Sequence, residues 1–332
     1  YASLVATAYG VAGATAASRG RSYRFAGALG AFFVGFAGNL LVPLRRLLWR
    51  LPEPIARPIA STIEAESAVE AGRVLDIGTF SYWTASRIIP GTINEFPLFA
   101  FLNGDLHAHM VSTPFLLLAA GVGLAYLRTP VEEVRRRRLL VLGALPSIAG
   151  VLAVINTWSF PTVAGIAWLV LFLGETEPGD LLPAAIQMAI PDVDGLRHEA
   201  ARIIVATGLA GAVSLLGVLW ALPFFLGPAS GRNVAVVSTP SALVPFLVVH
   251  GAFLVVFWVG VGTIVARRWP RFRGQALGIV AVVLGVGIVL ERPGVGLLIP
   301  LIIAAWLLRR NGTEAGYETI LVTDEDDPYI DH

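Results

Sequence analysis

The chain has 332 residues, of which 56% are hydrophobic and only 14% are charged. Soluble domains contain roughly 45–50% apolar and 25% charged residues, so this composition excludes a water-soluble globule and predicts a multi-pass protein of the cell membrane, surrounded by lipid. The chain has no cysteine, and its 24 basic residues are all arginine, which excludes thiolate metal sites and lysine nucleophiles. The net charge of +1 gives no information about a nucleic-acid partner. For a chain surrounded by lipid we expect no nucleic-acid partner and no nucleotide or redox cofactor.

The chain starts at Tyr1 inside an apolar run, without the charged region or cleavage site of a signal peptide. We therefore expect it to be a piece of a longer polytopic protein. A span of the hydrocarbon core needs about 20 apolar residues, and nine stretches approach or reach that length. The sequence thus predicts an all-α transmembrane helix bundle of about nine spans. The stretches are residues 1–17, 25–44, 111–127, 139–155, 160–174, 203–226, 243–266, 276–290 and 294–308.

Arginine clusters predict the orientation of this bundle. With nine spans, four clusters fall on one side, which the positive-inside rule makes cytoplasmic. The segment 45–110 is then external. It contains Arg45, Arg46 and Arg50, which the positive-inside rule would place in the cytoplasm, but the rule is weak for loops longer than about 60 residues. Residues 1–312 form the predicted transmembrane domain, and the acidic tail 313–332 is predicted to be disordered. The four clusters are Arg19, Arg21 and Arg24; Arg128 with Arg135, Arg136, Arg137 and Arg138; Arg267, Arg268, Arg271 and Arg273; and Arg309 with Arg310.

The segment 82–114 combines an apolar composition with ionisable side chains. Ionisable groups at membrane depth are costly, and they usually mark a functional site or a paired cluster. Proline and glycine break the segment into short pieces, which is tolerated at that depth only next to protein or a water-filled cavity. We therefore predict a re-entrant or interfacial element below an external cavity. The ionisable residues are Arg87, Glu95, Asp105, His107 and His109.

Asp105, His107 and His109 alternate at a spacing of two residues. In an extended conformation all three side chains can point one way, whereas in a helix His107 leaves the face shared by the other two. One carboxylate and two imidazoles suit a divalent metal such as manganese, magnesium or zinc, and Glu95 could add a further oxygen. Without a metal, the same groups are a carboxylate base oriented by histidine. The structural alternative is a hydrogen-bonded cluster of side chains that stabilises a re-entrant loop.

Three further polar residues fall on the predicted external side. Asn156 could bind a sugar or cap a helix end, and Trp158 could stack on a sugar face or anchor at the membrane interface. Arg232 could hold a lipid phosphate through its planar fork or serve as a headgroup anchor. We therefore include all three, together with Arg87, as candidate substrate-binding residues.

The strings Glu95-Phe96-Pro97, Gly104-Asp105-Leu106-His107-Ala108-His109 and Pro114-Phe115 resemble the hallmark stretch of uncharacterised archaeal and chlorobial membrane proteins called the Chlor_Arch_YYY family. That family is similar in architecture to GT-C glycosyltransferases, which take a sugar from a polyprenyl-phosphate carrier. The resemblance implies a GT-C-like fold and a catalytic acid in an external loop, in some members with a divalent metal. The amino-terminal spans in which GT-C enzymes keep their principal acid lie outside this sequence.

The leading hypothesis from the sequence is a glycosyltransferase-like enzyme that acts on a polyprenyl-phosphate-linked sugar at the external face. Asp105, with Glu95, would be base or metal ligand, and His107 and His109 would bind metal or orient the carboxylate. Arg87 or Arg232 would hold the phosphate. The alternatives are a transporter or flippase for a lipid-linked or polar solute, and a non-catalytic envelope subunit.

Overall fold

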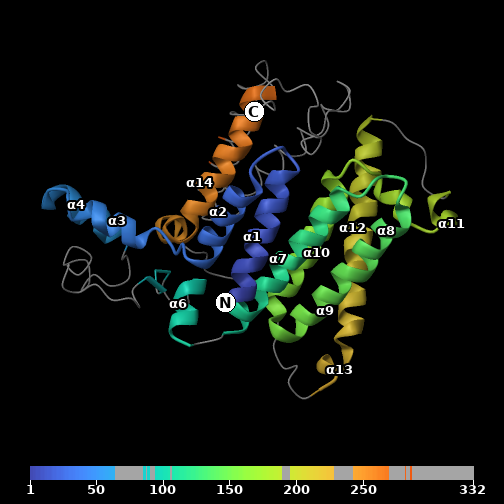
Figure 1. Ribbon diagram of the computed structural model, residues 1–332, viewed down its shortest axis with the longest axis horizontal. Helices are drawn as coiled ribbons and strands as arrows, with labels where there is room; N and C mark the ends of the chain where they lie inside the picture. The colour runs from blue at the N-terminus through green and yellow to red at the C-terminus, as the bar shows by residue number, and fades with distance from the viewer. Residues whose placement is uncertain are drawn as a thin grey trace. The chain divides into compact units, whose positions relative to one another are not determined.

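A computed structural model describes residues 1–63, 85–86, 88–89, 94–104, 107–188, 195–227 and 242–268, together with 281 and 285. All regular elements within these ranges are helices (Figure 1), which confirms the all-α prediction for this part of the chain. The chain divides into two compact units, each built from segments that are distant in sequence. The described residues of unit 1 lie within Tyr1–Phe36 and Gly104–Val234, and those of unit 2 within Ala37–Asn103 and Ala235–Tyr317.

Within the described residues, four helical stretches are long and apolar enough to cross a membrane, judged by length and composition: Ala108–Leu127, Val134–Ile155, Arg197–Trp220 and Leu243–Gly260. Two shorter apolar helices, Ala2–Ala17 and Thr157–Leu173, coincide with two further predicted spans. The predicted spans 276–290 and 294–308 lie outside the described residues, apart from 281 and 285. The number of nine spans therefore stays a prediction.

Unit 1 is a bundle of mostly long helices joined by short turns (Figure 1). A five-residue π-helix joins α8 to α9 into one continuous helical stretch, and a single 3-10 turn separates α9 from α10. Its elements are α1 (Ala2–Ala17), α2 (Tyr23–Gly35), α7 (Ala108–Leu127), α8 (Val134–Leu139), the π-helix η3 (Leu140–Ala144), α9 (Leu145–Ile155), the 3-10 helix η4 (Thr157–Ser159), α10 (Phe160–Leu173), the 3-10 helix η5 (Pro178–Leu181), α11 (Ala184–Gln187), α12 (Gly195–Trp220) and α13 (Leu222–Phe225).

Helices α1 and α2 form an antiparallel pair whose close approach depends on glycine. A Cβ atom on Gly13 would lie 2.8 Å from the Tyr23 ring, and one on Gly27 would lie 2.8 Å from the Tyr9 ring. The two tyrosine rings meet edge to face, with centroids 5.5 Å apart. Small residues that let helix backbones approach are the usual interface of membrane helices, so the alanine- and glycine-rich sequence specifies this hairpin directly.

The helices of unit 1 alternate in direction and give the bundle two distinct ends. Helix α7 runs from His107 to Arg128, where the guanidinium donates to Ala14 O near the end of α1. Helix α9 returns to Asn156, α10 runs back to Gly174, and α12 returns to Trp220. We call the end with Arg128 and Arg137 the arginine end, and the end with His107 and Asn156 the histidine end.

Unit 2 contains shorter helices packed against one long helix. Its described elements are α3 (Leu41–Leu48), α4 (Glu53–Ile63), α6 (Pro97–Leu102) and α14 (Leu243–Arg268). Its core joins the inward faces of α3 and α4 to a buried residue of α14 and to the segment around Ala85. The buried core residues are Leu41, Leu48, Ala56, Ala60, Ala85, Ile88 and Val248.

The predicted span 25–44 differs from the structure, because α2 ends at Gly35 and a new helix begins at Leu41. Backbone groups in the break find partners outside a helix. Leu40 N–H donates to Val248 O at 2.8 Å, and Asn39 donates to Ala85 O while its own side-chain oxygen accepts from Leu41 N–H. Hydropathy does not register this break, since most of the residues from 36 to 44 are apolar.

Within the described part of the predicted re-entrant segment 82–114, the short helix α6 (Pro97–Leu102) precedes the first turns of α7. Asn94 closes the loop before α6: its N–H donates to Ser86 O at 2.9 Å, and its side-chain oxygen accepts from Ile89 N–H at 2.7 Å. After α6, Gly104 adopts φ +66°, a conformation that favours glycine. The glycine of the Gly-Asp-Leu-His-Ala-His string is therefore the residue type that its backbone requires.

Candidate functional site

Arg202 of α12 makes the most extensive set of polar contacts at the arginine end. Its side chain is fully buried and donates to the carbonyls of Leu171 and Phe172 at 3.1 Å each, and also to those of Gly174 and Thr176. Its other nitrogen pairs with Glu177 Oε1 at 2.6 Å. The last carbonyls of a helix have no partner within that helix, so this guanidinium caps the C-terminus of α10 and also neutralises its charge there.

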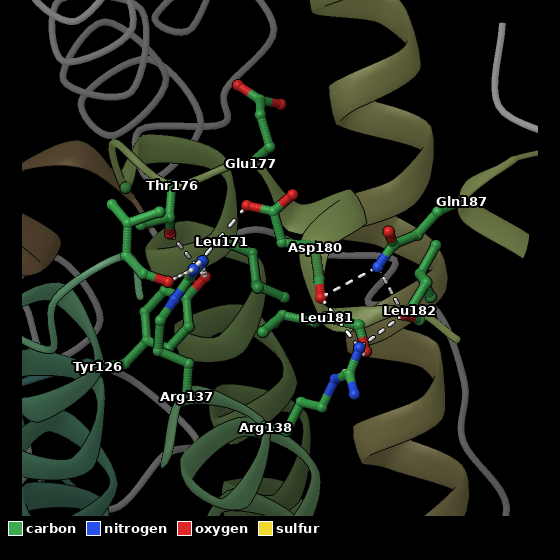
Figure 2. A network of polar contacts seen from close by, with 12 residues as sticks. Tyr126, Arg137, Arg138, Leu171, Thr176, Glu177, Asp180, Leu181, Leu182 and Gln187 are labelled. Carbon is green, nitrogen blue, oxygen red and sulfur yellow. Dashed lines mark hydrogen bonds and ion pairs between the residues drawn. The ribbon is translucent and has the colours of Figure 1, made fainter. Parts of the chain in front are cut away.

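Arg138 holds the turn that follows (Figure 2). Its guanidinium donates to the carbonyls of Asp180, Leu181 and Leu182 at 3.1, 3.0 and 2.7 Å. The amide of Gln187 donates to two of the same carbonyls, at 3.2 Å for Asp180 and 2.8 Å for Leu182. The 3-10 helix η5 is thus fixed through its backbone oxygens.

Arg137 has a fully buried side chain, which lies between η5 and Tyr126 of α7 (Figure 2). Its guanidinium donates to Tyr126 Oη at 3.1 Å, lies 5.2 Å from the centroid of the same ring, and is 3.9 Å from Asp180 Oδ2. The π-helix η3 follows directly. Successive residues of a helix point about 100° apart, so Arg137 meets Tyr126 while Arg138 meets η5.

These contacts make the arginine end a structural element. The nitrogens of Arg138 and Arg202 are engaged by backbone carbonyls and a carboxylate, so they have little capacity left for a ligand. From the sequence, the run 135–138 was predicted to be an orientation signal, with binding of anionic lipid as the alternative. Nothing in the sequence distinguishes the buried Arg137 from the exposed Arg135 and Arg136, and only tertiary packing separates them.

The histidine end places His107 and His109 together at the start of α7. His107 has extended backbone with ψ 148° and precedes the helix, whereas His109 lies in its first turn. The two rings are nearly parallel, with an interplanar angle of 15° and centroids 5.5 Å apart. The sequence had offered an extended or a helical conformation for this string, and the structure combines them, with extended backbone at His107 and helix at His109. Both imidazoles are half-buried.

A chain of hydrogen bonds links this pair to Asn156. Ser112 Oγ donates to His109 O at 2.8 Å and lies 3.0 Å from Ser159 Oγ. Because the single hydroxyl proton of Ser112 is used on His109, Ser159 is the donor to Ser112. Asn156 Nδ2 in turn donates to Ser159 Oγ at 2.9 Å and to Ser112 Oγ at 3.4 Å. The chain runs from the amide through two buried hydroxyls to the backbone of His109.

Trp158 lies next to this chain and is 67% exposed. It belongs to the single 3-10 turn between α9 and α10. Trp220, at the end of α12, is also exposed, and a Cβ on Gly150 of α9 would lie 2.6 Å from it. Exposed tryptophans at one end of a helix bundle are typical of the membrane–water interface, and an exposed indole face can also stack on an apolar sugar face.

Of the predicted site residues, the structure thus brings His107, His109 and Asn156 together within one network, with Trp158 beside it. Glu95 lies in unit 2, half-buried directly before α6. Asp105, Arg87 and Arg232 lie outside the described residues. Sequence analysis missed Ser112 and Ser159, although Ser159 belongs to the Asn-Thr-Trp-Ser string. A serine in an apolar run gives no separate signal, because it also serves helix packing in membranes.

The described residues contain no group of three or more histidine and acidic side chains able to hold a metal ion. The histidine pair itself provides two imidazole nitrogens, and a tetrahedral zinc site with an open position needs three protein ligands. Asp105 is two residues from His107 in sequence and has the right chemistry for the third ligand. The described residues thus provide two of the three ligands, and Asp105 as the third ligand stays a prediction, because it lies outside them.

The helix lengths, the composition and the glycine-mediated packing define an integral, multi-pass α-helical membrane protein. Residues 1–323 match the family described as "Uncharacterized membrane protein (DUF2298)", and the chain belongs to that family. Neither the curated proteins nor the solved structures gave a match.

Proposed function

We propose that this protein is a membrane-embedded glycosyltransferase-like enzyme that uses a polyprenyl-phosphate-linked sugar at the histidine end, facing outward. The observation that carries the proposal is the stacked pair His107–His109 at the start of α7, coupled through Ser112 and Ser159 to Asn156. Polar and ionisable groups in a membrane bundle are costly and mark functional sites by default.

The position of the histidine pair supports the binding of a phosphate. The N-terminus of the 20-residue helix α7 presents backbone N–H groups and the positive end of its dipole. Imidazolium groups or a metal held by His107, His109 and Asp105 would add positive charge at the same place. Such a metal would supply Lewis-acid stabilisation of the departing phosphate. Electrostatic stabilisation of this kind is usually the largest catalytic contribution.

Trp158 and Asn156 support the choice of a sugar. An exposed indole offers a face for the sugar ring, and the Asn156 amide offers both donor and acceptor groups beside it. In the transfer step, the bond between the anomeric carbon and the phosphate oxygen breaks, and a bond to an acceptor hydroxyl oxygen forms. The acceptor proton passes to the Asp105 carboxylate, with Glu95 as the second candidate base, and Arg87 or Arg232 holds the polyprenyl phosphate.

The test is transfer from a radiolabelled polyprenyl-phosphate sugar by the full chain in proteoliposomes, with His107→Ala and His109→Ala compared with His198→Ala. His198 is a half-exposed histidine at the arginine end and is the matched control. We expect each variant at the histidine end to lose at least 100-fold in rate, the scale of a lost acid–base or orienting group. The His198 variant should keep most of the rate, and the unfolding midpoints should remain equal.

Full activity in both variants at the histidine end would overturn the proposal. Uptake of a solute into the vesicles without any covalent product would instead favour the transporter or flippase. Asp105→Asn provides the corresponding test of the carboxylate, since it retains the size of the side chain and removes the base.

A further inference from the structure

We propose that α3 and α4 of unit 2 lie flat in the membrane interface and bind the acidic headgroups of a phospholipid surface. This inference concerns a surface remote in sequence from His107 and goes beyond the proposed function. Helices α3 and α4 follow one another as two short elements (Figure 1). With 8 and 11 residues, they are too short to cross a hydrocarbon core that needs about 20.

The contact with α14 sets the depth of these helices. Their inward face packs against Val248, with Val244 and Val249 at the edge of the same core. These residues belong to the first two turns of the candidate span Leu243–Gly260. An 18-residue helix is about 27 Å long, close to the thickness of the hydrocarbon core. Elements packed on its first turns therefore lie at the membrane boundary.

The outer surfaces of both helices are apolar along one flank. On α4, Ile55 and Ile59 are 53% and 41% exposed, while Ala56 and Ala60 between them and the core are buried. On α3, Leu47 is similarly exposed. Residues four apart lie on one helix face, so Ile55 and Ile59 form a continuous strip. A strip of this kind at the membrane boundary is stabilised by insertion into the upper acyl region.

The charges on the same helices match an acidic surface. Residues 41–63 contain four arginines and one acid, Glu53, a net charge of +3. Arg45 is buried in the core, whereas Arg46, Arg50 and Arg57 are exposed. An apolar strip flanked by exposed arginines is the pattern of an interfacial amphipathic helix. Binding of acidic headgroups would also account for arginines in a segment that the sequence predicts to be external.

The depth of α4 can be measured directly, because the natural chain has no cysteine and each introduced cysteine takes a single nitroxide label. The probe is the full chain in vesicles of phosphatidylcholine with phosphatidylglycerol, with collision rates measured against oxygen and an aqueous nickel complex. Ile55→Cys and Ile59→Cys should favour oxygen, and Arg57→Cys on the opposite flank should favour nickel. Leu118→Cys and Glu132→Cys, exposed on α7 and in a loop, give the lipid and water references.

Labels at 55 and 59 that are as accessible to nickel as the label at 57 would overturn the inference. The charge is tested separately through the preference of the protein for spin-labelled phosphatidylglycerol over phosphatidylcholine. Each cation near an acidic surface contributes roughly fivefold, so Arg46→Gln with Arg50→Gln should reduce the preference at least fivefold. Glu53→Gln is the control and should not reduce it. An unchanged preference in the double variant would overturn the assignment to acidic lipid, whatever the outcome of the sugar-transfer assay.

Discussion

At the arginine end of unit 1, Arg138 and Arg202 donate to seven backbone carbonyls of the segment 171–182. At the histidine end, by contrast, the half-buried rings of His107 and His109 stack on one another, and two serine hydroxyls link His109 O to Asn156. Both ends contain polar groups that are costly in a membrane protein. At the arginine end, backbone carbonyls accept the hydrogen bonds of the guanidinium groups, so these groups stabilise the fold. At the histidine end, the two buried hydroxyls and the Asn156 amide hold the backbone of His109, beside half-buried imidazoles. Full burial and donors engaged by backbone carbonyls therefore identify the polar cluster at the arginine end as a structural one.

The largest expected effect on stability is at Arg202. Arg202→Ala leaves four carbonyls and Glu177 without their guanidinium, and breaking a buried ionic cluster costs about 3–5 kcal/mol. Arg202→Lys should recover only part of the lost free energy of unfolding, because an ammonium group cannot reproduce the planar set of donors of a guanidinium. Unfolding in detergent measures both. Arg197→Ala, exposed on the same helix, should change the free energy of unfolding by less than about 0.5 kcal/mol; equal losses at both positions would break the comparison.

Arg138→Ala should destabilise by about 2 kcal/mol, since charged donors to backbone carbonyls contribute roughly 1.5–3 kcal/mol. The loss is local to η5, so protease cleavage within 178–188 should become faster than in the wild-type chain. Arg136→Ala is the control, because Arg136 is exposed and pairs only with Glu133 at 3.2 Å, a surface pair of small value. Unchanged cleavage in the Arg138 variant would contradict the role assigned to it.

At the histidine end, Ser112→Ala removes the hydroxyl that joins Ser159 to His109. We expect a loss of about 1 kcal/mol in stability, the usual value of one hydrogen bond, and a larger loss of transfer activity because the His109 backbone is less firmly held. Ser147→Ala is matched to it: Ser147 is an exposed serine of the same bundle that bonds Gly143 O at 2.9 Å. Activity that falls only in proportion to stability would show that the network is structural, as at the arginine end.

The smallest change in stability is expected for Trp158→Ala. The side chain is mostly exposed, so the free energy of unfolding should change by less than about 0.5 kcal/mol. If the indole stacks on the sugar, KM for the donor should rise several-fold while kcat changes little. Trp168→Phe, which keeps the ring that stacks on Phe172, should leave KM unaltered. Equal KM values for the Trp158 variant and the wild type would restrict Trp158 to membrane anchoring.

Several parts of the bundle could be predicted from hydropathy, and the deviations have identifiable causes. Helix α7 begins at Ala108, three residues before the predicted start of its span. Helix α12 begins at Gly195 instead of residue 203, because its first turns contain charged residues, such as Arg202, that a hydropathy window rejects but that tertiary contacts neutralise. The continuous helix through Val134 likewise includes arginines that become buried or cap a turn.

The candidate site was partly accessible as well. The spacing of His107 and His109 predicted that they could point together, and the external turn at Asn156 was predicted on the same side. Their connection was not predictable, because it passes through Ser112 and Ser159, which are 47 residues apart in sequence and resemble ordinary packing residues. The sequence also grouped Glu95 with the histidines; Glu95 lies in unit 2, and its role beside them stays a prediction.

By itself, the sequence determined the solvent, the helical class, most of the long helices and the residues too polar for their surroundings, because the cost of placing a side chain in lipid is set first by its residue type. The tertiary structure decided which arginines are buried, which serines bridge helices, and where a helix ends among apolar residues. Those outcomes depend on which donors meet which acceptors across the bundle, and that pairing is a property of packed helices that no single stretch of sequence contains.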